Sequence, residues 1–154
     1  MAEHASTNCL TSRGIGAKLL RCFNMAGADP DAEIHDPETH LVSIVLEVML
    51  GLREEVASFR NDYCTPDRTC IRDYVHVVDL TVAHVRAVET TSPGAFRQYI
   101  LGSGFASVRE IMDALKRVKG WGTRWREADR QPADPLPMIA DVGRTARDLG
   151  FVPT

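Results

Sequence analysis

The sequence predicts an α/β fold, because three apolar strand-like runs each lead into a polar loop or a helix. The run Ala17–Phe23 ends in Asn24 and a loop of small residues. A second run, Tyr74–Val78, is followed by the helical pattern Leu80–Glu89. A third, Phe96–Leu101, passes through Gly-Ser-Gly into another helix. Open α/β folds bind ligands at the carboxyl edge of their parallel strands, and a strand that ends in Asn and small residues suits that edge.

The composition is that of an ordinary soluble globular protein. The 154 residues suffice for one domain with a core, and 44% of them are hydrophobic and 25% charged. A net charge of −3, with both signs intermixed, predicts no binding to nucleic acid or to an anionic membrane. The apolar run Leu41–Leu50 is too short to cross a bilayer, and the N-terminus lacks a signal-peptide pattern. A cytoplasmic location is therefore expected.

Metal and redox motifs are not indicated. The polar segment Asp29–Thr39 contains acidic residues and His35, but their order matches no ligand pattern, so a solvated loop is predicted. The cysteines are scattered without a C-x-x-C pair, which favours reduced thiols. They are Cys9, Cys22, Cys64 and Cys70.

The first third of the chain provides a helix, a strand and a second helix. Met1–Arg13 is weakly helical and Gly14 is expected to end it. The glycines of Gly14-Ile15-Gly16 precede a strand, whereas a dinucleotide-binding glycine loop follows one, so we interpret them as a helix-to-strand connection. His40–Leu50 is nearly all apolar and predicts a helix that is buried all round or packs against another domain or subunit. Glu54–Phe59 predicts a short strand.

The stretch from Thr65 to Leu80 combines a predicted turn, a candidate anion-binding arginine and a predicted helix start, and the rest of the prediction is built around it. Pro66-Asp67 predicts a turn closed by an Asx-type hydrogen bond. Arg72 follows the turn, where a guanidinium can bind a phosphate or carboxylate with two donors, and Asp73 is expected to hold it in place. Asp79 is predicted to cap the helix Leu80–Glu89. His76 lies within a strand-like run, which favours a structural role over that of a general base.

The last third contains the clearest helix signal. Ser107 and Glu110 form a capping box, and a helix from there places Val108, Ile111, Met112, Leu115 and Val118 on one face. Trp121 and Trp125 are interpreted as packing residues. Asp141–Leu149 predicts a final helix, stopped by Gly150 with Phe151 packing back.

Residues 65–80, T-P-D-R-T-C-I-R-D-Y-V-H-V-V-D-L, resemble the T-x-D-G-T-x-x-R-D-Y-x-H-V-x-D-L signature of UDP-glucose 4-epimerases, NAD-dependent enzymes of the extended short-chain dehydrogenase group. The resemblance continues through H-D-P-E-T-H-L at 35–41 and over nearly the whole chain. It implies the C-terminal part of a Rossmann-like fold. Two sheet strands and a small mixed α/β substrate-binding lobe are expected as a single truncated domain (residues 1–154), with the N-terminal dinucleotide-binding half missing.

The resemblance also implies a set of substrate-binding residues drawn from separate segments. An asparagine contacts the diphosphate or sugar, two residues at a helix start border the nucleotide-sugar and uridine, and a backbone lies along the uracil. An arginine holds the phosphates, and an aspartate holds the ribose or neighbouring groups. In the order of the chain these residues are Asn24, His40, Leu41, Phe59, Arg72 and Asp134.

Several positions depart from the family pattern. Cys22 stands in place of the tyrosine that lies against the nicotinamide, and Gln131 in place of a phosphate-binding arginine. Ile100 replaces an asparagine before the Gly-Ser-Gly segment, which is one residue short. Arg60 and Arg68 replace glycines, and if those positions need positive φ each would cost about 1 kcal/mol or more.

The chain contains neither the G-x-x-G-x-x-G motif nor the Y-x-x-x-K pair of the family. The M-x-E that follows the family's lysine matches Met1-Ala2-Glu3, so the chain is expected to begin just past that lysine. The hypothesis is therefore an epimerase fragment that is inactive alone and does not hold NAD. It is expected to retain weak UDP-sugar binding. Its strand edges and the helix His40–Leu50 are expected to be partly uncovered. Two alternatives stay open. One is a non-catalytic UDP-sugar-binding or interaction module that acts with a partner, either a complementing N-terminal half or a second copy in a homo-oligomer. The other is a fragment of a related nucleotide-sugar dehydratase or decarboxylase.

Overall fold

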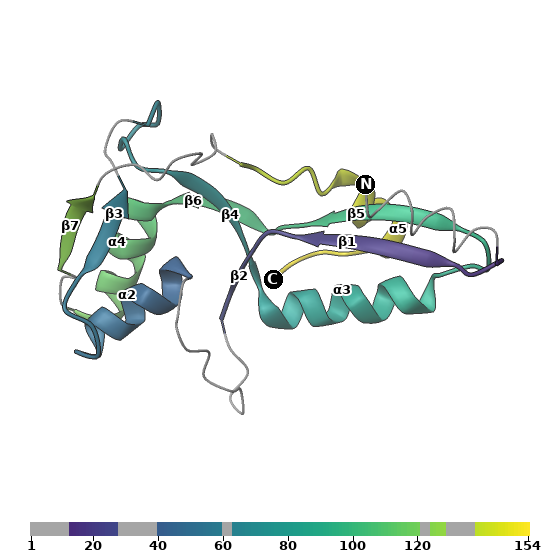
Figure 1. Cartoon of the computed structure of the whole chain (residues 1–154), viewed down its shortest axis with the longest axis horizontal. Coiled ribbons are helices and arrows are strands. Elements are labelled where there is room, and N and C mark those ends of the chain that lie inside the picture. The colour runs from purple at the N-terminus through teal and green to yellow at the C-terminus, as the bar shows by residue number, and fades with distance from the viewer. Residues whose placement is uncertain (1–12, 28–39, 60–62, 121–123, 129–137) are drawn as a thin grey trace.

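The structure, a computed structural model, describes residues 13–27, 40–59, 63–120, 124–128 and 138–154. Within these ranges the protein is elongated and consists of two lobes joined by a small sheet (Figure 1). Of the helix predicted at the N-terminus, only Arg13 is among the described residues. Arg60, Trp121, Gln131 and Asp134 also lie outside the described ranges.

The first lobe is built on a parallel pair of strands. Strand β1 (Ala17–Cys22) pairs with β5 (Phe96–Leu101) over their whole length. Helices α3 (Val77–Glu89) and α5 (Gly143–Leu149) pack against this pair (Figure 1). Burial of apolar side chains between the strands and the helices is the main stabilising term of such a layer. The buried cluster consists of Val75, Leu80, Ala83, Ala87, Tyr99, Leu101, Leu149 and Phe151.

The second lobe has its own smaller core. It combines helices α2 (Leu41–Met49) and α4 (Val108–Lys119) with the parallel strands β3 (Val56–Phe59) and β7 (Trp125–Ala128). Its buried residues are Val45, Met49 and Val56, against which Leu41, Ile44, Val48, Met112 and Leu115 pack. The two clusters share no residue, so each lobe has its own buried core.

A three-stranded sheet connects the lobes. Strand β4 (Ile71–His76) lies at its centre, with β2 (Asn24–Ala26) parallel on one side and β6 (Gly104–Ser107) antiparallel on the other. Strand β2 follows β1 after one residue, and β4 runs directly into α3 (Figure 1). The chain that leaves the first lobe at the end of β1 therefore pairs almost at once with β4, a strand of the stretch Thr65–Leu80.

Several local predictions are confirmed. Strand β5 has the predicted bounds, and Ser107 and Glu110 form the capping box at the start of α4. Gly150 ends α5 in the left-handed conformation at φ 58°, and Phe151 is buried in the core of the first lobe. The glycines at positions 14 and 16 precede β1, as predicted for a connection into a strand.

Other predictions are wrong in detail. Helix α3 begins at Val77, and its N-cap is His76, whose Nδ1 accepts a hydrogen bond from the Val78 backbone. Asp79 lies in the first turn of the helix, where its carboxylate accepts two hydrogen bonds from Thr154. The short strands β2, β6 and β7 were not predicted. Val118 is 77% exposed, whereas the other four residues of the predicted face of α4 are half-buried.

Apolar surface stays uncovered in the described part of the chain. Strand β1 is paired only with β5 among the described strands, and within α2 only Val45 and Met49 are buried. An unpredicted stripe of exposed valines also follows one side of α3. It consists of Val78, Val82, Val85 and Val88.

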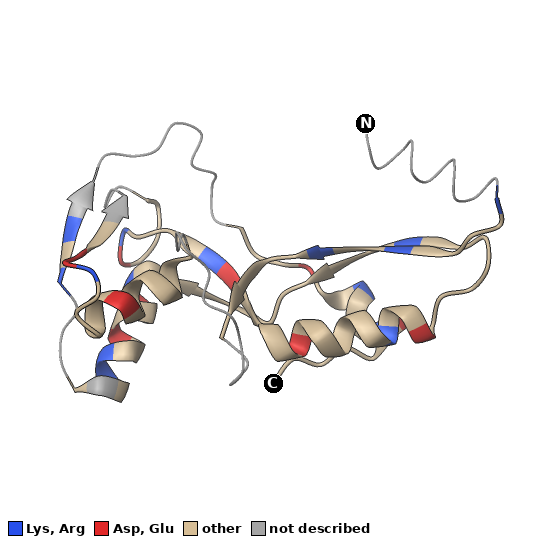
Figure 2. Ribbon diagram, turned by 60° about the horizontal axis from the view of Figure 1, so that its bottom comes forward, with Lys and Arg blue, Asp and Glu red and all other residues tan. Residues whose placement is uncertain are grey.

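Lys and Arg positions and Asp and Glu positions are intermixed along the ribbon of both lobes (Figure 2). None of the helices within the described ranges is long and apolar enough to span a membrane.

The turn before β4 contains a strained arginine. Arg68 has φ 63° and is the single non-glycine residue with positive φ among those described. The left-handed conformation brings Cβ close to the following carbonyl oxygen, which costs roughly 1–2 kcal/mol for most L-residues. The strain predicted at this position from the family's glycine is therefore confirmed for Arg68.

We expect Arg68→Gly to raise the free energy of unfolding by up to about 1 kcal/mol, because glycine adopts this conformation without a Cβ clash. Urea denaturation followed by circular dichroism measures the change. Arg117→Gly is the matched control, because Arg117 lies exposed within α4, where glycine costs about 1 kcal/mol. A loss of stability in Arg68→Gly equal to that of Arg117→Gly would contradict the strain.

Candidate functional site

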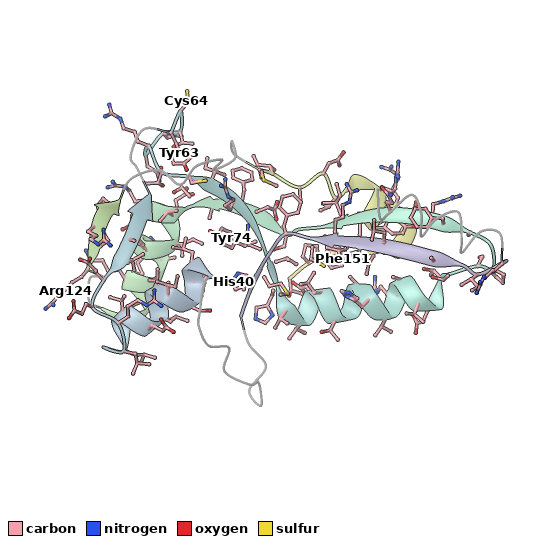
Figure 3. All side chains as sticks on the ribbon, in the orientation of Figure 1. His40, Tyr63, Cys64, Tyr74, Arg124 and Phe151 are labelled. Atoms are coloured by element: carbon pink, nitrogen blue, oxygen red, sulfur yellow. The ribbon has the colours of Figure 1, made fainter. Side chains whose placement is uncertain are left out.

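A pocket of about 360 Å³ opens between the connecting sheet and the second lobe. Its walls come from β2, α2, β3, β4 and the loop before β4. The lining residues are Asn24, Met25, His40, Leu41, Val42, Ile44, Arg53, Val56, Ala57, Tyr63, Cys70, Arg72, Tyr74 and Val108. Figure 3 shows Tyr74 and His40 at the junction of the two lobes, with Arg124 at the outer end of the second lobe and Phe151 inside the first.

Four of the six predicted binding residues lie in this pocket: Asn24, His40, Leu41 and Arg72. They come from three separate segments of the chain. Asp134 lies outside the described residues, and of Phe59 only the backbone is described, as the last residue of β3. Val56 and Ala57 of the same strand line the pocket.

The alternation of side chains along β4 decides which residues face the pocket. Arg72 and Tyr74 are two residues apart and both line it, whereas Asp73 and Val75 are buried on the opposite face. Tyr74 was not predicted, although its spacing from Arg72 on a strand was the signal that could have identified it. Met25, Arg53, Tyr63 and Cys70 were also missed, because Met25 lies on a strand of three residues and the others lie outside helices and strands, so none has such a periodicity.

The predicted pairing of Asp73 with Arg72 is corrected by the structure. Asp73 is 3% exposed, and its carboxylate accepts hydrogen bonds from the backbone N–H groups of Ser103, Gly104 and Ala140. Successive side chains of a strand point to opposite faces, which separates this carboxylate from the pocket side of β4.

Two features of the pocket suit an anion. Arg72 contributes a guanidinium, which presents several donors in a planar fork. His40 is the N-cap of α2, and His40, Leu41 and Val42 all line the pocket, so the amino end of α2 borders it. The amino end of a helix has a partial positive charge and free N–H groups. Arg53 adds a second guanidinium, and its Nε lies 2.9 Å from the Glu47 carboxylate.

Tyr74 is a hydrogen-bond donor at neutral pH and cannot serve as a general base. Burial, helped by the neighbouring Cys70, raises its pKa to about 12, although the Arg72 charge acts in the opposite direction. A tyrosine base needs a pKa lowered toward the working pH. Tyr74 therefore does not replace the tyrosine of the missing Y-x-x-x-K pair.

The loop that positions Tyr63 and Cys70 is held by Asp67. The Asp67 carboxylate accepts hydrogen bonds from the backbone N–H of Thr69 at 2.9 Å, from its hydroxyl at 2.8 Å and from the hydroxyl of Ser107. The first of these closes the predicted Asx-type turn. Burial opposes the ionisation of Asp67, but these hydrogen bonds and the charge of Arg109 outweigh it, so the pKa lies below its ordinary value.

No group of three or more potential metal ligands occurs within the described ranges. Within the described ranges, Cys22, Cys64 and Cys70 form no disulfide bond.

A family model matches residues 1–102 of the chain, and its description is the NAD dependent epimerase/dehydratase family. The match covers more than half of the sequence. The chain belongs to this family. The resemblance seen in the sequence is thereby confirmed.

Curated relatives agree with the family assignment. The chain is 38% identical over 153 residues to a UDP-glucose 4-epimerase of Corynebacterium glutamicum, covering 98% of this chain and 46% of that protein. It is 42% identical over 150 residues to one of Halalkalibacterium halodurans, covering 94% and 45%. The chain thus spans about half the length of the curated relatives that it matches.

Solved structures show the same relation. The UDP-glucose 4-epimerase of Brucella ovis in complex with NAD superposes with a TM-score of 0.89 at 37% identity, covering 99% of this chain and 49% of that one. The enzyme of Bifidobacterium longum in complex with NAD⁺ and UDP gives 0.88 at 29% identity, covering 99% and 47%. The chain is therefore a half-length piece of the extended short-chain dehydrogenase fold.

We expect Asp67→Asn to lower the free energy of unfolding by about 1 kcal/mol at pH 7, because hydrogen bonds to a charged acceptor are lost. The lowered pKa means that the unfolded chain binds a proton before the folded one does as the pH falls. The stabilisation from ionised Asp67 is thus complete above the ordinary value of 3.8 and is lost below it, as the pH passes through the folded-state pKa. Urea denaturation between pH 7 and pH 2 should show the two proteins converging at the acid end. Asp113→Asn, at an exposed position of α4, is the control; a constant difference at every pH would exclude the charge as the cause.

Proposed function

We propose that this chain is the C-terminal, substrate-binding half of a UDP-glucose 4-epimerase, folded as a single truncated domain, and that its pocket binds the UDP part of a nucleotide sugar. The observation that carries the proposal is the convergence of Asn24, His40, Leu41 and Arg72 on one pocket. The resemblance implies that these four residues contact the substrate.

The chemistry of the pocket fits a nucleoside diphosphate. The guanidinium of Arg72 and the amino end of α2 provide the positive end for the diphosphate. Protonated Tyr74 adds a hydrogen-bond donor on the same wall as Arg72. Val56, Ala57 and Val108 supply apolar surface, of the kind on which a uracil ring can lie.

The described residues do not fit the family's NAD. Gly14 and Gly16 precede β1 instead of following a strand, so they cannot seat a pyrophosphate on a helix N-terminus. Cys22, at the end of β1, is exposed and offers no aromatic ring to a nicotinamide. Tyr74 stays protonated at neutral pH. Inversion at C4 by removal and return of a hydride requires that cofactor, so the proposal assigns to this chain substrate binding without turnover.

A second candidate function is that of a UDP-sugar-binding module that acts with a partner in the cytoplasm. It is favoured by β1, which pairs with no described strand other than β5 and therefore has a second edge suited to another strand. A complementing N-terminal half would pair along that edge, and a homo-oligomer would do so through a second copy. A dehydratase or decarboxylase fragment ranks lower, because the H-D-P-E-T-H-L and R-D-Y-V-H-V segments follow the epimerase pattern.

We expect Arg72→Ala to abolish UDP binding and Gln131→Arg to strengthen it, because the first removes the main phosphate-binding charge and the second restores another. The wild-type affinity is expected to be millimolar or weaker, about −4 kcal/mol, because a solvent-accessible charge is screened. Titration of UDP followed by NMR chemical shifts measures all three proteins. Arg97→Ala is the matched control, since Arg97 is exposed on β5 in the other lobe.

Micromolar binding by the wild type would contradict the expected weakness of the site. Binding that survives Arg72→Ala and is unchanged in Gln131→Arg would show that the phosphates do not bind there. A loss of binding in Arg97→Ala equal to that in Arg72→Ala would point to a general charge effect.

We expect the purified chain neither to interconvert UDP-glucose and UDP-galactose nor to retain NAD. The physical reason is that the sequence has neither the family's pyrophosphate-binding glycine motif nor its Y-x-x-x-K pair, and that the raised pKa of Tyr74 excludes this pocket tyrosine as the base. A coupled assay with added NAD, together with cofactor analysis of the denatured protein, checks both statements. Turnover above the buffer blank would overturn the assignment of a non-catalytic half.

A further inference from the structure

Asp73 lies between the two residues of β4 that line the pocket, but its own side chain is buried on the opposite face. The exposed fraction is 3%, so the carboxylate is almost fully removed from water. Such a charge is tolerated only when hydrogen bonds replace its hydration. One oxygen accepts from the backbone N–H of Ser103 at 3.0 Å and of Gly104 at 3.4 Å, and the other accepts from that of Ala140 at 3.1 Å.

The backbone of Asp73 binds two further segments. Its carbonyl oxygen accepts a hydrogen bond from the side-chain amide of Asn24 at 2.8 Å, and Asn24 itself lines the pocket. Its N–H donates to the carbonyl of Met138 at 3.2 Å, in a short parallel bridge that pairs Arg72 with Met138. One residue therefore joins β2, β4, the start of β6 and the segment 138–140.

The space around this carboxylate is closed. A Cβ at Gly102 would lie 2.4 Å from Asp73 Oδ1 and 2.6 Å from the Cβ of Ala140, which is far inside van der Waals contact. Glycine at position 102 thus lets the backbone approach the carboxylate. The carboxylate has no room to reorient without moving Ser103 or Ala140.

We propose that Asp73 is a positioning residue for the pocket: its buried carboxylate fixes the register and direction of β4 and thereby aims Arg72 and Tyr74 at the diphosphate. This inference rests on the proposed function, since it concerns UDP binding at the same site. A strand side chain is oriented by its backbone. Three hydrogen bonds to an ionised acceptor hold that backbone more firmly than neutral pairs would.

The test compares Asp73→Asn with Gly102→Ala and Asp79→Asn in the whole chain. Asp73→Asn replaces an acceptor by an amide whose N–H groups face backbone N–H donors, and Gly102→Ala displaces the carboxylate without changing its charge. Asp79→Asn is the matched control, because Asp79 is likewise a buried acceptor, 7% exposed, but it binds Thr154 in the first lobe. Circular dichroism confirms that each variant is folded at the temperature used.

UDP and uridine are titrated into each protein in separate experiments and followed by NMR. The initial slope of chemical-shift change against ligand concentration gives the relative affinity. We expect Asp73→Asn and Gly102→Ala to weaken UDP at least about tenfold, equivalent to about 1.4 kcal/mol. Uridine should be affected much less, because it has no diphosphate for Arg72 to bind. Asp79→Asn should change neither slope. The inference is overturned if folded Asp73→Asn binds UDP like wild type, if UDP and uridine lose affinity in parallel, or if Asp79→Asn has the same effect.

Two further readouts make every outcome decisive. If Asp73→Asn does not fold, the slopes of the UDP and uridine titrations of Gly102→Ala decide the inference. If the wild type binds no UDP, the proposed function fails, and the positioning role is judged on the Arg72 Nε–Hε resonance in the free protein. A shift of that resonance in Asp73→Asn and not in Asp79→Asn supports positioning, and an unchanged resonance overturns it.

Discussion

The carboxylate of Asp73 is buried where the two lobes meet, and the geometry of the pocket depends on how its charge is satisfied. Removing a carboxylate from water costs several kcal/mol unless hydrogen bonds replace the lost hydration. Here the replacement comes from the backbone amides of Ser103, Gly104 and Ala140, which belong to segments far apart in the sequence. Any conformation that separates these segments leaves a buried charge unsatisfied, so the connecting sheet has essentially one arrangement.

The two lobes on either side of this junction have different structural roles. The first lobe is a sheet and helix layer with the larger core, and the second is a smaller mixed unit whose buried cluster centres on Val45 and Val56. Because the clusters share no residue, the sheet of β2, β4 and β6 is the main mechanical connection between them. The pocket lies at this connection, so it is sensitive to the relative placement of the lobes. Fixing that placement is what a binding site made of separate segments requires.

The family relation gives this architecture a functional meaning. The chain matches about half of its epimerase relatives in both sequence and structure. It retains a pocket with an arginine, an asparagine and a helix N-terminus, and the described part offers no strand-to-helix glycine loop. Under the proposed function, the pocket binds and positions a nucleotide sugar, and the redox chemistry comes from a cofactor held elsewhere. The departures at Cys22 and Gln131 agree with this proposal, since the resemblance implies that each removes a contact present in the family's complete enzymes.

The sequence by itself determined the features that rest on local rules. The capping box at Ser107, the strand Phe96–Leu101 and the stop at Gly150 follow from short-range hydrogen bonding and backbone conformation, and all three are confirmed. The strain at Arg68 could be predicted for the same reason, once the family pattern showed a glycine at that position. Motif resemblance also identified four of the residues that line the pocket.

Only the tertiary structure decided what depends on contacts between distant segments. Asp73 was expected to hold its neighbour Arg72, but the pleat of β4 sends the two side chains to opposite faces, and the partners of Asp73 lie 30 and 67 residues further along the chain. The cap of α3 is His76 and not Asp79, because the helix begins at Val77 and Asp79 lies within its first turn. There the Asp79 carboxylate accepts hydrogen bonds from Thr154, a contact with no signal in the local sequence. The short strands β2, β6 and β7 contain too few residues for a periodic pattern and exist because a partner strand satisfies their backbone groups. Sequence patterns fix what neighbouring residues do to one another, whereas the hydrogen-bond partners of a buried charge are fixed by the fold.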